Sequence, residues 1–239
     1  STSGSNPNSL IKAIIDSTGQ VSSSQVFATG FNAPNGVAID SNDTMYVTNY
    51  MSNTISRVTA GGVVSGSWAT TGTNPKGIAT DGSYLWVANR GSNTVQKFNM
   101  TTGGALFTVT NIWVPDGLTY SKNDCSLFVT NFTANTVTQI YPSGGTSAYA
   151  NNAQNLSSPA GIIVENDGVA VVANSSTASA ASGNTGVFLT RDTSLRTIGV
   201  PMTSPADMAY DAQGRLYITE RSPARVTMVP TSGPAIALY

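Results

Sequence analysis

The 239-residue chain is almost uncharged: 11 Lys and Arg residues stand against 12 Asp and Glu, the formal net charge is −1, and only 10% of residues are charged. A chain this neutral lacks the basic surface that binds nucleic acid or an anionic membrane, so neither is an expected partner. No apolar run reaches the roughly 18 residues that span a bilayer, so membrane insertion is not expected either. Histidine is absent, which removes His-based acid–base catalysis and every metal site that needs imidazole.

Small polar residues dominate the rest of the composition. Ser (29), Thr (31) and Asn (21) make up about a third of the chain, while 40% of residues are hydrophobic. Low charge together with many β-branched residues indicates a folded, β-rich protein rather than a disordered one. The single cysteine, Cys125, excludes an internal disulfide and is expected to be a small buried residue.

The chain begins at Ser1 and carries five Asn-x-Ser/Thr sequons, at Asn42, Asn99, Asn131, Asn155 and Asn174. Sequons of this kind are the acceptors of N-glycosylation in secreted proteins. We therefore expect an exported, extracellular protein.

A sequence repeat sets the organisation of the chain. The motif Pro34-Asn35-Gly36-Val37 recurs every 40 to 46 residues, and its later copies begin at Pro75, Pro115, Pro159 and Pro205. A second motif follows each time, first as Tyr46-Val47-Thr48-Asn49 and later ending at Asn89, Asn131, Asn174 and Glu220. A third begins with Asn-Thr at Asn53, Asn93, Asn135 and Asn184. A fixed period of this length is typical of repeat architectures.

Each repeat holds four β-branched runs separated by turn residues, which predicts a four-stranded antiparallel meander. In the first full repeat the strands are predicted near residues 36–40, 45–49, 54–58 and 63–69. Four strands in every forty-odd residues predict an all-β chain built as a β-propeller.

The Val-Thr-Asn and Val-Ala-Asn endings resemble YVTN-type propeller repeats, and Pro-x-Gly-Val-Ala-Ile-Asp resembles the related NHL repeats. The Pro-Asn-Gly and Pro-Asp-Gly turns are more distantly similar to those of gluconolactonase and senescence-marker propellers. This resemblance implies the fold strongly and the function poorly, since such propellers include lyases, lactonases, lectins and protein-docking platforms.

In chain order, the repeats are an N-terminal half blade at 8–33 followed by full blades at 34–74, 75–114, 115–158, 159–204 and 205–239. Asn8 to Lys12 aligns with Asn53 to Arg57, so the half blade supplies only a third and a fourth strand. We expect one propeller domain over 1–239, six-bladed with the half blade as one member. A five-bladed alternative and a homo-oligomer formed through the half blade stay open, because an unpaired strand edge invites association.

The loop before the first strand and the turn between the second and third strands should share one face of such a fold. Charged, amide and aromatic residues gather in these loops in the first three full blades, which predicts one asymmetric ligand site. The candidate ligand-binding residues are Asn35, Tyr50, Lys76, Arg90, Trp113, Asp116 and Phe132.

We expect a lectin-like, non-catalytic module for carbohydrate or another small neutral ligand, since polar loops with a few aromatics suit hydroxyl-rich molecules. The gluconolactonase resemblance implies an alternative, a metal-dependent lactonase or esterase, in which Asn35 and Asp116 would hold Ca²⁺ or a similar cation. Lys76 between them and the lack of an aligned Glu count against that alternative, and no cofactor is expected. A protein-interaction scaffold is the third hypothesis.

Overall fold

The computed structural model describes residues 8–151, 156–165, 169–175, 186–189, 195–197, 202, 204–221, 224–229 and 236–237. The chain divides into two compact units, residues 1–108 and 109–239, which we call unit 1 and unit 2. All regular secondary structure in the described residues is β-strand. Within them, no helix has the length and apolar character needed to cross a membrane.

Unit 1 contains one two-stranded sheet and two four-stranded sheets. The two-stranded sheet pairs β1 (Ser9–Ile15) with β2 (Val21–Thr29). The next sheet consists of β3 (Pro34–Ile39), β4 (Met45–Asn49), β5 (Thr54–Val58) and β6 (Val64–Thr70). The third consists of β7 (Pro75–Thr80), β8 (Tyr84–Asn89), β9 (Thr94–Asn99) and β10 (Ala105–Val109). The strands predicted for the first full repeat therefore agree with β3 to β6 within two residues.

Unit 2 contains three four-stranded sheets. The first consists of β11 (Pro115–Ser121), β12 (Ser126–Asn131), β13 (Thr136–Ile140) and β14 (Thr146–Ala150). The second consists of β15 (Pro159–Val164), β16 (Ala170–Asn174), β17 (Gly186–Leu189) and β18 (Leu195–Thr197). The third consists of β19 (Pro205–Tyr210), β20 (Leu216–Arg221), β21 (Ala224–Val229) and β22 (Ile236–Ala237).

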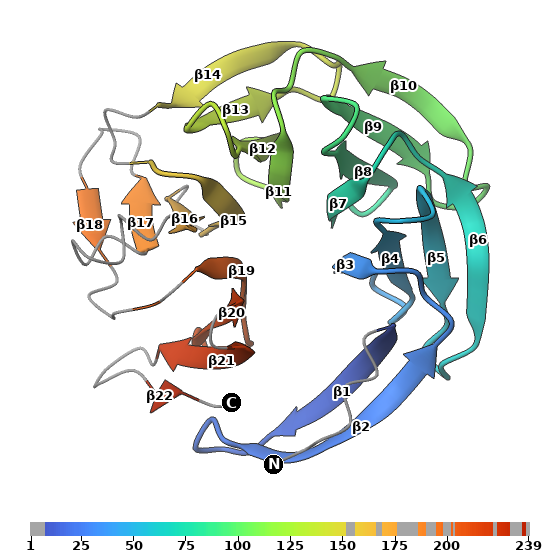
Figure 1. Ribbon diagram of the computed structural model, residues 1–239, viewed down its shortest axis with the longest axis vertical. Helices are drawn as coiled ribbons and strands as arrows, with labels where there is room; N and C mark the ends of the chain where they lie inside the picture. The colour runs from blue at the N-terminus through green and yellow to red at the C-terminus, as the bar shows by residue number, and fades with distance from the viewer. Residues whose placement is uncertain are drawn as a thin grey trace. The chain divides into compact units, whose positions relative to one another are not determined.

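The sheets follow one another in a β-propeller arrangement. Every four-stranded sheet is an antiparallel meander in chain order, and within each unit its first strand lies innermost and its fourth outermost (Figure 1). The first strands of successive sheets adjoin, β3 with β7 in unit 1, and β11 with β15 and β15 with β19 in unit 2. The all-β propeller class is thus confirmed, while the total of six blades stays a prediction.

Apolar side chains fill the space between successive sheets. In unit 1, Tyr46 and Ile55 of one sheet pack with Ile78, Leu85 and Phe98 of the next. An aromatic residue occupies one position of the second strand in four of the five full blades; it is buried at Tyr46, Trp86 and Phe128, and half-buried at Tyr217. These residues belong to the core rather than to a site.

The expectation for Cys125 is wrong, because this residue is a free and exposed cysteine. It lies in the turn between β11 and β12 with a φ of 47°, outside both strands. Because Cys125 lies in this turn and not in a strand, its side chain does not alternate with the core-facing residues of β11 and β12, and its thiol lies outside the core.

Candidate functional site

The predicted site positions adjoin one another in every full blade. The residue after the second strand donates its backbone N–H to the carbonyl of the residue that precedes the proline, over 3.0–3.1 Å. The five pairs are Tyr50 with Ala33, Arg90 with Asn74, Phe132 with Val114, Ser175 with Ser158, and Arg221 with Ser204. The loop before the first strand and the turn after the second therefore form one surface in each blade, which we call the loop face.

The residue before each proline has a left-handed backbone. Its φ lies between 48° and 55° at Ala33, Asn74, Val114, Ser158 and Ser204. This conformation turns the carbonyl toward the N–H of the neighbouring turn. It is costly at Val114, because a β-branched side chain crowds the backbone there.

A bulge follows each proline, because two residues of the first strand face one residue of the second. Pro34 pairs with Asn49 and the next paired residues are Val37 and Val47. In that blade the bulge is held by Thr48, whose hydroxyl accepts from the Gly36 N–H at 2.9 Å and donates to the Lys76 carbonyl at 2.7 Å. The threonine hydroxyl thereby ties its own first strand to the first strand of the next sheet.

Thr130 makes the same bridge in unit 2, from the Gly117 N–H at 2.8 Å to the Ala160 carbonyl. The close approach also explains the glycine of the motif. A Cβ at Gly117 would stand 2.3 Å from the Ala160 carbonyl oxygen, and a Cβ at Gly36 would stand 2.4 Å from that of Lys76.

The asparagine directly before the third strand connects neighbouring blades through its side chain. Asn53 Oδ1 accepts from the Asn74 N–H at 2.8 Å, and Asn135 Oδ1 accepts from the Ser158 N–H at 2.7 Å. Both asparagines have a positive φ, 58° and 55°. These side-chain to backbone hydrogen bonds reach from one blade to the following blade.

The asparagine that ends the second strand is buried and mainly bonds to its neighbouring third strand. Asn131 Nδ2 donates to the hydroxyls of Thr136 and Thr138, at 2.8 Å each. In the last blade Glu220 replaces it and accepts from Arg225 Nε at 2.6 Å and from the Thr227 hydroxyl at 2.7 Å. The hydrogen bond with Glu220 raises the pKa of Arg225 above its ordinary value. These side chains connect the second strand of a blade to its third strand.

In unit 1 the structure places four of the predicted residues on the loop face with unequal exposure. Asn35 is exposed, Tyr50 and Arg90 are half-buried, and Lys76 is buried with only 8% of its surface exposed. The Asn74 side chain donates to the Tyr50 carbonyl at 3.1 Å, which fixes the backbone of that turn.

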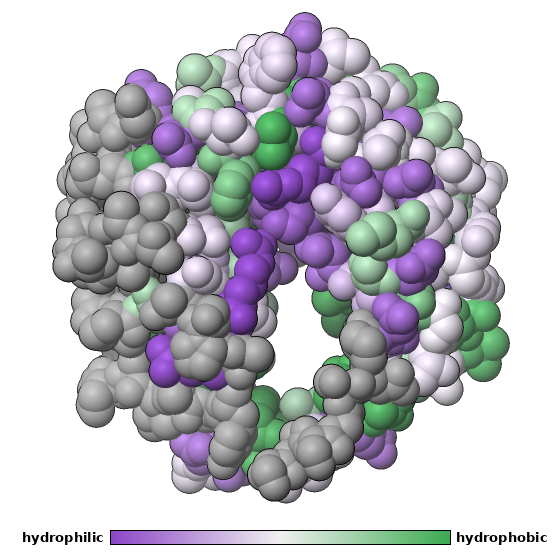
Figure 2. Space-filling view, viewed as in Figure 1, coloured by the Kyte–Doolittle hydropathy of each residue, from purple (hydrophilic) through white to green (hydrophobic). Residues whose placement is uncertain are grey.

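In unit 2 the structure places the other three predicted residues around one turn. Trp113 is 61% exposed, Asp116 is 3% exposed, and Phe132 is half-buried. The Phe132 N–H donates to the Val114 carbonyl at 3.1 Å. Phe132 therefore lies next to the turn that also carries Trp113, the residue before Val114. Figure 2 shows hydrophilic surface over β11, the strand that follows this turn.

Asn35 belongs to unit 1 and Asp116 to unit 2. In the described part of the chain, no group of three or more His, Cys, Asp or Glu residues could hold a metal ion.

Sequence reasoning missed a cation enclosed by aromatic rings. Lys97 is buried, and its ammonium lies 3.9 Å from the centre of the Tyr84 ring, 4.8 Å from that of Trp86 and 5.6 Å from that of Phe107. Cation–π contacts of this kind compensate for the loss of water around the charge. Trp86 and Lys97 are paired across the adjacent strands β8 and β9. The sequence pattern that could have predicted this contact is an aromatic residue in the second strand with a basic residue at the paired position of the third strand.

Comparisons with known proteins identify the fold. No protein-family model and no curated protein matches the chain. A chain of a nidogen–laminin complex has a TM-score of 0.81 at 14% identity, over 94% of this chain and 86% of that one. A catalytically inactive histidine-to-alanine variant of virginiamycin B lyase from Staphylococcus aureus, solved with quinupristin, has a TM-score of 0.68 at 17% identity, over 94% and 75%. A gluconolactonase from Xanthomonas campestris has a TM-score of 0.68 at 17% identity, over 86% and 75%.

These likenesses show that the fold is a β-propeller. At such identities they show the fold alone. The assignment to YVTN or NHL repeats in particular stays a prediction.

Proposed function

We propose that the protein is a non-catalytic binding module that takes a carbohydrate or a similar small neutral ligand on its loop face. The observation that supports this most directly is the exposed indole of Trp113. An exposed tryptophan gives a flat apolar surface on which a sugar ring can stack, and its N–H can bond to a hydroxyl.

The surroundings of Trp113 fit a polar but uncharged ligand. Phe132 lies beside the same turn, because its N–H donates to the Val114 carbonyl. Asp116 lies two residues after Val114 in the chain. Stacking on the indole would orient a sugar, and polar loop groups would select its hydroxyls. In unit 1 the corresponding positions Asn35, Tyr50, Lys76 and Arg90 complete the proposed set of ligand-binding residues.

One observation favours binding over catalysis. The histidine-to-alanine variant of the lyase neighbour is catalytically inactive, and this chain has no histidine to play such a part. The metal-dependent hydrolase alternative would need Asn35 and Asp116 together with further oxygen ligands. An extracellular location belongs to the same proposal, since the sequons would be used only there.

The test is a glycan-array screen of the 239-residue protein with and without EDTA, followed by affinity measurements on any hit. We expect Trp113→Ala to weaken binding roughly fivefold, because a lost stacking contact is worth about 1 kcal/mol. Tyr141→Ala is the matched control. It removes another exposed aromatic ring from unit 2, in the turn between β13 and β14 rather than on the loop face.

Equal affinity of the Trp113→Ala variant and the control would show that the indole is not the stacking surface. A blank array together with EDTA-sensitive hydrolysis of lactones would overturn the binding proposal in favour of the hydrolase. A blank array without turnover would move the function to a protein-interaction scaffold.

A further inference from the structure

A groove in unit 1 lies between the two-stranded sheet and the four-stranded sheet that follows it. Its volume is about 450 Å³, which is within the range of small-molecule sites. The residues that line it all belong to unit 1. Among them are Leu10, Lys12 and Phe27 on the side of the two-stranded sheet, and Val37, Ile39 and Met45 on the other side.

The groove is separate from the loop face. Asp43 and Ala60 also line it, and they come from the turn between β3 and β4 and the turn between β5 and β6. In a meander, these two turns lie at one end of the sheet, and the turn after the second strand lies at the other end. A ligand in the groove would therefore occupy a second site, and the inference does not rest on the proposed function.

The walls of the groove are hydrocarbon side chains with exposed surface. Val37 and Ile39 are 47% and 55% exposed, and both point to the same side of β3 because they are two residues apart. Met45 is half-buried, and its unbranched side chain can adapt to the shape of a bound group. These walls favour a hydrocarbon ligand, because binding would remove their apolar surface from water.

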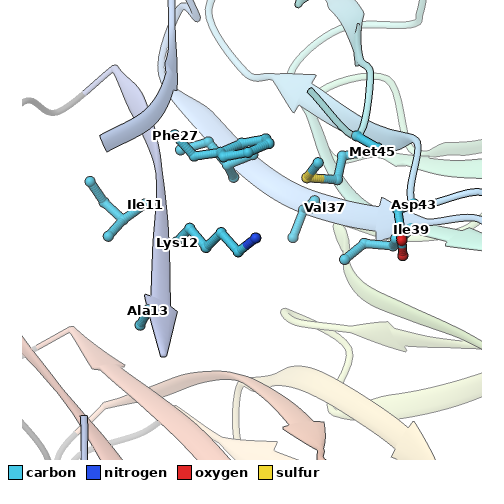
Figure 3. A pocket seen from close by; sticks show the side chains of 10 residues that line it. Ile11, Lys12, Ala13, Phe27, Val37, Ile39, Asp43 and Met45 are labelled. Atoms are coloured by element: carbon cyan, nitrogen blue, oxygen red, sulfur yellow. The ribbon is translucent and has the colours of Figure 1, made fainter. Parts of the chain in front are cut away.

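A cation projects into these apolar surroundings. Figure 3 shows the side chain of Lys12 extending from β1 across the groove toward Val37. Its ammonium lies 5.7 Å from the centre of the Phe27 ring. An ammonium at this place attracts an anionic group, whereas the walls beside it favour hydrocarbon.

An acidic residue gives the groove a direction. Asp43 is exposed, and Figure 3 places it beside Ile39, on the opposite side of the groove from Lys12. A carboxylate would be attracted by Lys12 and repelled by Asp43, so the anionic end of a ligand should lie beside Lys12. Lys12 is the one basic residue among those that line the groove. A head group with a single negative charge therefore matches the groove better than a phosphate does.

We propose that the groove binds an amphiphilic carboxylate, with the carboxylate beside Lys12 and an aliphatic chain along Val37, Ile39 and Met45. The apolar walls account for the chain, and the ammonium accounts for the charged head. A sugar suits this groove poorly, because its hydroxyls would lie against hydrocarbon side chains.

The first test compares three probes with the same chain: octanoate, octanol and octyltrimethylammonium. Each is titrated by calorimetry into the unaltered 239-residue protein, below the concentrations at which the probes form micelles. Octanoate should bind with one-to-one stoichiometry and roughly fivefold more tightly than octanol, which is the size of effect that an ion pair with an exposed lysine gives. Octyltrimethylammonium should bind more weakly than octanol, because Lys12 repels it.

The place of binding can be read from the methionine methyl groups by NMR. Met45 lines the groove, whereas Met51 is 66% exposed in the turn between β4 and β5. Octanoate should shift the signal of the Met45 methyl group and leave that of Met51 in place.

Two pairs of variants then separate the charge from the wall. Lys12→Met keeps the apolar stem and should reduce the affinity for octanoate to that for octanol, whereas Lys122→Met, at an exposed lysine in a turn of unit 2, should preserve the difference. Ile39→Ser should weaken octanoate and octanol alike, because it removes part of the wall. Leu106→Ser is its control, at a 50% exposed residue of β10 that does not line the groove.

The proposal is overturned if octanoate binds no more tightly than octanol, or if octyltrimethylammonium binds most tightly. It is also overturned if octanoate leaves the Met45 signal in place, or if Lys122→Met removes the preference for octanoate as completely as Lys12→Met does. Sugar binding at Trp113 is measured separately, so either proposal can fail without the other.

Discussion

The threonine bridge between blades gives the sharpest prediction for stability. Thr130 is fully buried, and its hydroxyl accepts from the Gly117 N–H at 2.8 Å and donates to the Ala160 carbonyl. Thr130→Val keeps the shape of the side chain and removes both hydrogen bonds. The backbone groups of Gly117 and Ala160 then stay buried without the partner they had.

A buried backbone group that loses its partner costs about 1–3 kcal/mol, so the two together should cost about 3 kcal/mol of the free energy of unfolding. For a chain of this size, that corresponds to a fall in Tm of roughly 6–12 °C. The measurement is urea unfolding of the wild-type protein, Thr130→Val and Thr130→Ser, with amide exchange at Gly117 as a local probe. The serine variant should lose much less stability, because it retains the hydroxyl.

Thr48 makes the equivalent bridge in unit 1, with bonds of 2.9 Å and 2.7 Å. Thr48→Val should therefore repeat the effect independently. The reasoning is refuted if Thr130→Val unfolds at the wild-type urea concentration, or if Thr130→Ser is as unstable as Thr130→Val.

Gly117→Ala should destabilise the protein by at least about 2 kcal/mol in urea unfolding, because its Cβ would stand 2.3 Å from the Ala160 oxygen. Gly66→Ala is the control, with no atom within 4 Å of its Cβ, and a similar loss there would contradict the steric reason. Val114→Asn should raise the free energy of unfolding by about 1 kcal/mol, because asparagine tolerates the φ of 49° better than valine; an unchanged or lower value argues against strain. Tyr149→Phe should stabilise the protein by about 1 kcal/mol, because the buried Tyr149 hydroxyl has no hydrogen-bond partner among the described residues. Burial raises the pKa of Tyr149, so the wild type should lose stability as the pH rises above 10.0, the ordinary tyrosine pKa, and the phenylalanine variant should lose less.

Much of the fold followed from local sequence. Turn residues and β-branched runs recur with the repeat, so strands such as β4 and β5 begin and end where predicted. The half blade was predicted because Asn8 to Lys12 repeats the start of a third strand, and β1 and β2 form a two-stranded sheet. Local propensity and periodicity suffice for features of this kind.

The properties of the site depended on contacts that the sequence does not show. The burial of Lys76 and Asp116 reflects how closely neighbouring first strands approach, which the repeat period does not reveal. The left-handed conformation of Val114 contradicts the preference of valine and is imposed by the hydrogen bond to Phe132. Cys125 was misplaced because its exposure follows from turn geometry rather than from residue type.

The hydrogen bond that closes each loop uses only main-chain atoms. Tyr50, Arg90, Phe132, Ser175 and Arg221 all donate the same N–H to the same kind of carbonyl. The blade therefore holds these positions without using their side chains, and an aromatic, basic or small residue fits equally well. Natural variation or a combinatorial library could change the chemistry of the loop face at these positions without disturbing the hydrogen bond that shapes it.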